Sequence, residues 1–80
     1  MLQRELLWKK ETMTRLEQAE FMTNVIRHHA SQEDHESAHA EEDELLDLLV
    51  RAVLDRDHDA YGIALMCDEV SNMHFYRWHA

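Results

Sequence analysis

Residues 45–54, LLDLLVRAVL, decide the fold class of this 80-residue chain. At about 100° per residue, their apolar side chains recur on one side of a helix. The same stripe continues back toward residue 38, so the pattern predicts a helix from about Gln32 to Asp55. Its inward-facing members are predicted to be Ala38, Glu42, Leu45, Leu46, Leu49, Ala52 and Val53.

A similar stripe lies on each side of this helix in the sequence. The first follows Thr14 and Glu17, which have the Thr-x-x-Glu spacing of a capping box. It comprises Leu16, Ala19, Met22, Val25, Ile26 and His29. The second follows the connector 56–59 and comprises Ala60, Ile63, Ala64, Cys67, Val70, His74 and Trp78. Short polar connectors between the stripes predict that neighbouring helices run antiparallel.

The turn residues support a helical fold. The chain has no proline and a single glycine, whereas strands joined by tight turns depend on both residue types. Ser31, followed by Asp34, is predicted to cap the middle helix, and Asp57 or Asp59 is predicted to cap the last one. We therefore predict an all-α fold with three antiparallel helices, or four, in a small bundle or helical hairpin array.

Residues 1–12 form an amphipathic stretch of their own. Its apolar stripe is out of phase with the one after Thr14. Three interpretations fit: the helix breaks near residues 12–14, or one long helix runs through and its first third packs elsewhere, or Met13-Thr14 is the natural start and the preceding residues are an upstream extension. The whole chain, 1–80, is predicted to be one helical domain, with 1–12 as an amphipathic extension. Because so short a chain buries only about 60–65% of its surface, a homodimer would add stability.

The charge balance restricts the partners. Eight Lys and Arg stand against 17 Asp and Glu, which gives a net charge of −9. Direct binding to nucleic acid or to anionic lipid depends on cationic side chains, so neither is expected. An acidic surface suits a basic protein partner, a bound cation or simple solubility.

The cysteine content and the hydropathy predict a cytoplasmic protein. Cys67 is the only cysteine, so an internal disulfide is excluded and a reducing compartment is favoured. Its place on the apolar stripe predicts a buried structural thiol. No apolar run approaches the ~18 residues of a membrane span, and the first residues lack the apolar core of a signal peptide.

Histidines and carboxylates form the clearest candidate site. Four of the seven histidines flank the connector near Ser31 and two lie near the C-terminus, so antiparallel helices would gather them at one end. Glu42 is the only charged residue within its stripe, and a buried carboxylate needs a partner unless it reaches solvent at the fraying edge of the stripe. The candidate metal ligands are His35, His39, Glu42 and His74, with His29 as an addition. No cofactor is expected otherwise; zinc or another divalent transition metal is the alternative.

Residues 35–39, His-Glu-Ser-Ala-His, also match the HExxH pattern. On a helix this pattern places two imidazoles on one face beside a glutamate that activates zinc-bound water. It resembles the zincin metalloprotease motif over these five residues alone. Acidic residues occupy the flanking places that are usually uncharged or apolar, and the chain is too short for a substrate cleft. A zinc hydrolase is therefore a remote alternative, and the protein is predicted not to be an enzyme.

Two groups of residues predict an interaction surface. The first is acidic and comprises Glu33, Asp34, Glu36, Glu41, Asp43, Glu44 and Asp47. The second combines aromatic residues with an arginine, types enriched at binding hot spots; it comprises Trp8, Phe75, Tyr76, Arg77 and Trp78. The leading hypothesis is a non-catalytic interaction protein whose partner is another protein or a second copy.

The run His-Ala-Glu-Glu-Asp-Glu-Leu-Leu at 39–46 and the terminal Arg-Trp-His-Ala at 77–80, on an acidic histidine-rich helix, resemble small all-helical orphan proteins of actinobacterial phages. The resemblance spans roughly Thr14 to Ala80. It implies an accessory protein of the host cytoplasm that acts by binding, and it transfers no catalytic residues. In a sharper form of this hypothesis, the acids imitate phosphates and the protein is a decoy for a nucleic-acid-binding surface.

Overall fold

The structure, a computed structural model, describes residues 13–73, where it contains three α-helices and no strand. They are α2 (Arg15–Ser31), α3 (His35–Leu54) and α4 (Ala60–Ser71). The predicted all-α class is confirmed for this part of the chain. The predictions for residues 1–12, including a fourth helix, and for residues 74–80 lie outside the described residues.

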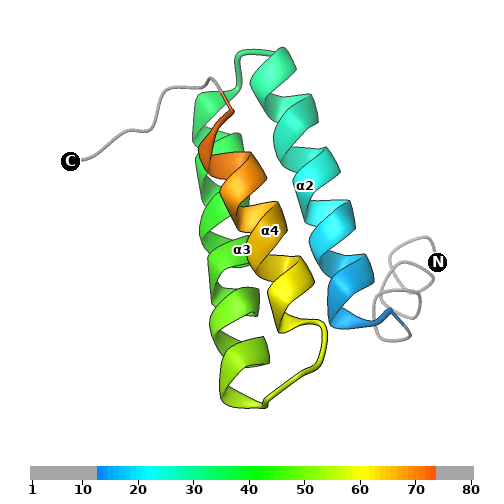
Figure 1. Cartoon of the computed structure of the whole chain (residues 1–80). Helices are drawn as coiled ribbons and strands as arrows, with labels where there is room; N and C mark the ends of the chain where they lie inside the picture. The colour runs from blue at the N-terminus through cyan, green and yellow to red at the C-terminus, as the bar shows by residue number, and fades with distance from the viewer. Residues whose placement is uncertain (1–12, 74–80) are drawn as a thin grey trace, which may run out of the picture.

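The three helices lie side by side, and each contacts the other two. In Figure 1 a short connection joins α2 to α3 at one end, and another joins α3 to α4 at the opposite end. Ion pairs link the helices along this arrangement. Arg27 on α2 lies 3.1 Å from Glu69 on α4, and Arg15 at the start of α2 reaches Asp55 and Asp57 after α3.

The start of α2 follows the predicted capping box. The Thr14 hydroxyl accepts the Glu17 N–H at 3.1 Å, and the Glu17 carboxylate accepts the Thr14 N–H at 2.9 Å. These two bonds satisfy backbone donors that have no partner inside the helix. The prediction of a capping box is therefore confirmed.

The predicted cap of α3 was wrong by three residues. Ser31 is the last residue of α2 and donates its hydroxyl to the His28 carbonyl. Glu33 then takes a left-handed conformation with φ 60° and turns the chain. Asp34 is the N-cap of α3, and its carboxylate accepts the Ser37 N–H at 3.2 Å. The start of α3 was predicted too early because Asp is equally suited to the N-cap position and to the first turn of a helix.

Two aspartates, Asp57 and Asp59, lie in the turn that precedes α4. Asp59 occupies the N-cap position, but its side chain makes no capping hydrogen bond. Asp57 instead accepts the Asp59 N–H at 2.9 Å and so orders the turn. The left-handed Arg56, with φ 56°, starts this connector.

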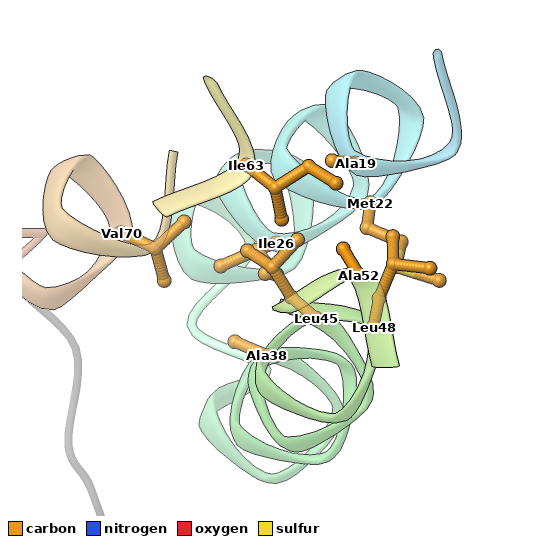
Figure 2. Close-up of a cluster of buried hydrophobic side chains, with 9 residues drawn as sticks. All are labelled: Ala19, Met22, Ile26, Ala38, Leu45, Leu48, Ala52, Ile63 and Val70. Carbon is orange, nitrogen blue, oxygen red and sulfur yellow. The ribbon is translucent and has the colours of Figure 1, made fainter. Parts of the chain in front are cut away.

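The core between the helices is small and almost wholly apolar (Figure 2). It consists of Ala19, Met22, Ile26, Ala38, Leu45, Leu48, Ala52, Ile63 and Val70. Thr23 is also buried, and its hydroxyl donates to the Ala19 carbonyl at 2.8 Å, which removes the cost of burying it. Each large apolar side chain that is fully buried contributes about 1.5–3 kcal/mol.

The predicted inward stripe of α3 was wrong at two positions. Leu46 and Val53 are 45% and 57% exposed, whereas Leu48, which was not predicted to face inward, is buried. The centre of the buried side is defined by Ala38, Leu45 and Ala52, which recur every seven residues. Leu48 lies on the flank of this side that faces Met22 of α2. Leu46 and Val53 lie past the opposite edge.

α4 approaches the Leu16 side chain of α2 closely at Gly62. A Cβ atom at this position would lie 3.0 Å from the Leu16 Cδ1 atom. A side chain at this position, beside the buried Ile63, would therefore require the end of the Leu16 side chain to shift.

Candidate functional site

The connection between α2 and α3 brings histidines and acids together. The His29 Nδ1 atom lies 3.7 Å from an Asp34 carboxylate oxygen, and the His28 and His29 rings lie 5.8 Å apart. On the first turns of α3, the His39 Nδ1 atom lies 3.4 Å from an Asp43 carboxylate oxygen. His29 and His39 therefore each lie near a carboxylate four or five residues further along the chain.

The predicted metal ligands are placed as follows. His35, His39 and Glu42 all lie on α3 and are half-buried, but they are not brought together as three ligand atoms within 4.8 Å of one another. His74 lies outside the described residues. The four-residue metal site thus stays a prediction. In the HExxH pattern, Ala38 is buried and Glu36 is exposed.

Within residues 13–73, the structure does bring together Asp57, His58 and Asp59, whose ligand atoms lie within 4.8 Å of one another. Sequence reasoning did not single out this group as a metal site, although its three titratable residues are consecutive. Both Asp57 oxygens are already engaged, one by the Asp59 N–H and the other by Arg15 at 3.2 Å. The His58 side chain is 92% exposed. These interactions of Asp57 therefore explain why the three consecutive side chains lie close together.

Hydrogen bonds at these two connectors also shift acid–base equilibria. The hydrogen bonds from Ser37 hold the pKa of Asp34 below its ordinary value, with a smaller contribution from His29 and His35. The backbone hydrogen bond from Asp59, aided by Arg15, lowers the pKa of Asp57. Both carboxylates are thus held in the charged form by local structure.

The half-buried Cys67 has the properties of a structural thiol. Its sulfur lies 4.0 Å from the Leu45 carbonyl oxygen. Burial raises the pKa of the Cys67 thiol, and the negative charge of Glu42 raises it further. Because the thiolate is the reactive form, a raised pKa disfavours nucleophilic chemistry at Cys67.

The seven acids predicted as an interaction surface do not share one face. All are exposed except Glu41, which is half-buried. Asp34 is committed to the cap of α3, and Asp47 accepts a hydrogen bond from Arg51 at 2.9 Å. The predicted aromatic group, Trp8, Phe75, Tyr76, Arg77 and Trp78, lies outside the described residues.

Three of these acids line a shallow groove between α2 and α3. The groove has a volume of about 430 Å³ and includes Asp43, Glu44, Asp47, Arg51, Gln18, Met22 and Leu48. Its apolar members, Met22 and Leu48, are core residues at the helix contact. The groove therefore combines three acids and one arginine with two nearly buried apolar residues.

Sequence reasoning missed an exposed apolar surface on α3. Leu46, Val50, Val53 and Leu54 are 45%, 54%, 57% and 75% exposed. A signal was available, since residues 45–54 contain more large apolar side chains than one side of a helix can bury. On α4, Tyr61 and Leu65 are also exposed.

Comparisons with known proteins add no family. No protein-family model matches the chain, and no similarity to a curated protein or to a solved structure is found. Among the helices described, none combines the length and the apolar character needed to cross a membrane.

Proposed function

We propose that this protein is a non-catalytic accessory protein that binds a basic protein partner through the acidic surface of an antiparallel three-helix bundle. The observation that carries the proposal is the charge of the folded part. Residues 13–73 contain 15 Asp and Glu but only four Arg. Three of those arginines, Arg15, Arg27 and Arg51, are already paired with acids. The remaining negative charge favours association with a cationic surface.

The interior supports a binding role. The buried residues within 13–73 are apolar except for Thr23, whose hydroxyl is used by the Ala19 carbonyl. The polar and titratable groups that are described lie at helix ends and on outer surfaces instead. The exposed carboxylates among them, such as those of Glu36 and Glu44, are accessible to a partner.

The partner class follows from the charge. A protein that binds nucleic acid presents cationic side chains spaced to meet phosphates, and a rigid helical surface of carboxylates would compete for them. The resemblance to phage proteins supports action in a host cytoplasm. Under this proposal the protein is an acidic decoy, and α3 supplies most of the contacts through Glu36 and Glu44 with their acidic neighbours.

The proposal is tested by affinity capture with the full chain as bait. The lysate comes from the cell in which the protein is naturally made, and the salt concentration is 100 mM or 500 mM. The double variant Glu36→Gln/Glu44→Gln removes two exposed acids of α3. The matched control, Glu20→Gln/Asp68→Asn, removes two exposed acids of α2 and α4.

We expect the captured partner to be lost at high salt and weakened at least about fivefold by the α3 variant, with less effect from the control. Capture that is indifferent to salt, or that responds equally to both variants, would contradict the proposal.

A further inference from the structure

The outward side of α3 is divided into an acidic half and an apolar half. Its acids, Glu36, Asp43 and Asp47, lie toward the start of the helix, and its apolar residues, Leu46, Val50, Val53 and Leu54, lie toward the end, with Leu46 and Asp47 adjacent at the boundary. Within each half, and across the boundary between Asp43 and Val50, residues recur at spacings of three, four or seven. These spacings place them on one side of a helix. We call this surface the outer face of α3.

The other described helices leave the apolar part of the outer face exposed, while Asp43 and Asp47 also line the groove beside α2. α3 packs on α2 and α4 through its other side, where Ala38, Leu45 and Ala52 are fully buried. The four apolar residues of the outer face remain 45–75% exposed. Single exposed apolar residues are common, but a contiguous group of them on one side of a helix is a candidate interaction surface.

The charge pattern disfavours a second copy as the occupant. If two outer faces met in parallel, the acids of one would oppose the acids of the other. If they met antiparallel, the acids of each copy would oppose the apolar half of its partner. Two chains of charge −9 would repel each other in either case.

The same pattern favours a cationic helix. We infer that the outer face of α3 docks an amphipathic helix of the partner protein, with Lys or Arg at one end of its contact stripe and large apolar residues at the other. The cations meet Glu36, Asp43 and Asp47, while the apolar residues cover Val50 and its neighbours. This inference rests on the proposed function and specifies its contact surface. The mode is that of an amphipathic helix laid on an apolar surface, read at i, i+3, i+4 and i+7.

The test uses two labelled helical peptides of identical composition and measures fluorescence anisotropy with the full chain. One peptide has its lysines at one end and its leucines at the other on a single face. The second has them interspersed. We expect the segregated peptide to bind at least about fivefold more tightly, because only it can match both halves at once.

Two variants locate the binding surface. Val50→Asp changes the outer face, and Leu65→Asp makes the same kind of change on α4 at a residue of equal exposure, 54%. We expect Val50→Asp to weaken binding of the segregated peptide at least about tenfold and Leu65→Asp to change it less than twofold. Circular dichroism and the melting temperature confirm that both variants fold.

The outcomes separate this inference from the proposed function. Equal binding by Val50→Asp and wild type, equal binding of the two peptides, or no binding of either peptide overturns the inference. The capture experiment with Glu36→Gln/Glu44→Gln can still succeed in each of those cases. Sedimentation that shows a dimer broken by Val50→Asp would also overturn it, in favour of a second copy.

Discussion

The inner side of α3 and the apolar half of its outer face both contain large apolar residues but have different roles. The inner side buries Ala38, Leu45 and Ala52 completely, whereas the outer face leaves Val50 and Leu54 more than half exposed. Both sides are rich in large apolar residues, so hydrophobicity alone does not separate them. Burial is decided by where α2 and α4 meet the helix. A helix with more apolar residues than its neighbours can cover therefore retains a surface available for binding.

The largest expected effect lies on the inner side. Leu45→Ala should reduce the free energy of unfolding by about 2–5 kcal/mol, because it leaves a cavity in the core. For so small a domain, this is a large share of the total. Its neighbour Leu46, which is 45% exposed, should cost less than about 1.5 kcal/mol when changed to alanine. Urea denaturation of both variants measures the difference, and equal losses would contradict the assignment of inner and outer sides.

The next largest effect is expected at Asp34, the N-cap of α3. Asp34→Ala should cost about 1 kcal/mol, since it removes the acceptor for the Ser37 N–H. Ser31→Ala should cost less than about 0.5 kcal/mol, because the Ser31 hydroxyl bonds only to the exposed end of α2. If Ser31→Ala were the more damaging change, the helix would start where the sequence pattern first suggested.

Much of this architecture is predictable from the sequence, and the failures have a common cause. Within residues 13–73, the helical class, the capping box at Thr14 and the inward positions of Leu45 and Ala52 follow from periodicity and local hydrogen bonding. The exposure of Leu46 and Val53 does not, because it depends on the angle at which two other helices meet α3. Because apolar residues occupy so much of the circumference of α3, the sequence of this helix alone does not separate its buried apolar residues from its exposed ones.

The candidate site shows the same limit. Histidines near the first connector were expected to lie close to acids, and His29 does lie near Asp34. The grouping of His35, His39 and Glu42 with His74 depends on the distant register of two helices, and only local pairs such as His39 with Asp43 are set by helical spacing. The outer face could not be predicted, because which apolar residues of α3 stay exposed depends on where α2 and α4 meet the helix.

A smaller effect is the pH dependence of the two ends of α3. The pKa values of Asp34 and Asp57 are lowered in the folded protein. A lowered pKa means that the unfolded chain binds protons first as the pH falls. The stabilisation is therefore present above the unfolded pKa of about 3.9 and is lost as the pH drops through the lower folded values.

Thermal melts between pH 2 and pH 6 test this expectation. Asp34→Asn keeps a capping side chain but removes the titration, so its melting temperature should fall less steeply below pH 4 than that of the wild type. Glu20→Gln, at an exposed acid of α2, is the control and should follow the wild type. If Asp34→Asn reproduced the full acid sensitivity, the cap would not be a source of it.

The smallest expected effect is on the outer face. Val50→Thr and Leu54→Gln should each change the free energy of unfolding by less than about 0.5 kcal/mol, because both side chains are more than half exposed and fill no cavity. Both substitutions should nevertheless change the free energy of binding a cationic helix by more than they change the free energy of unfolding. Weaker binding with unchanged stability distinguishes a docking surface from the core, because a substitution in the core reduces both the stability of the protein and its binding. If either variant unfolded the protein, the outer face would have to be part of the fold, and the contrast between the two sides of α3 would disappear.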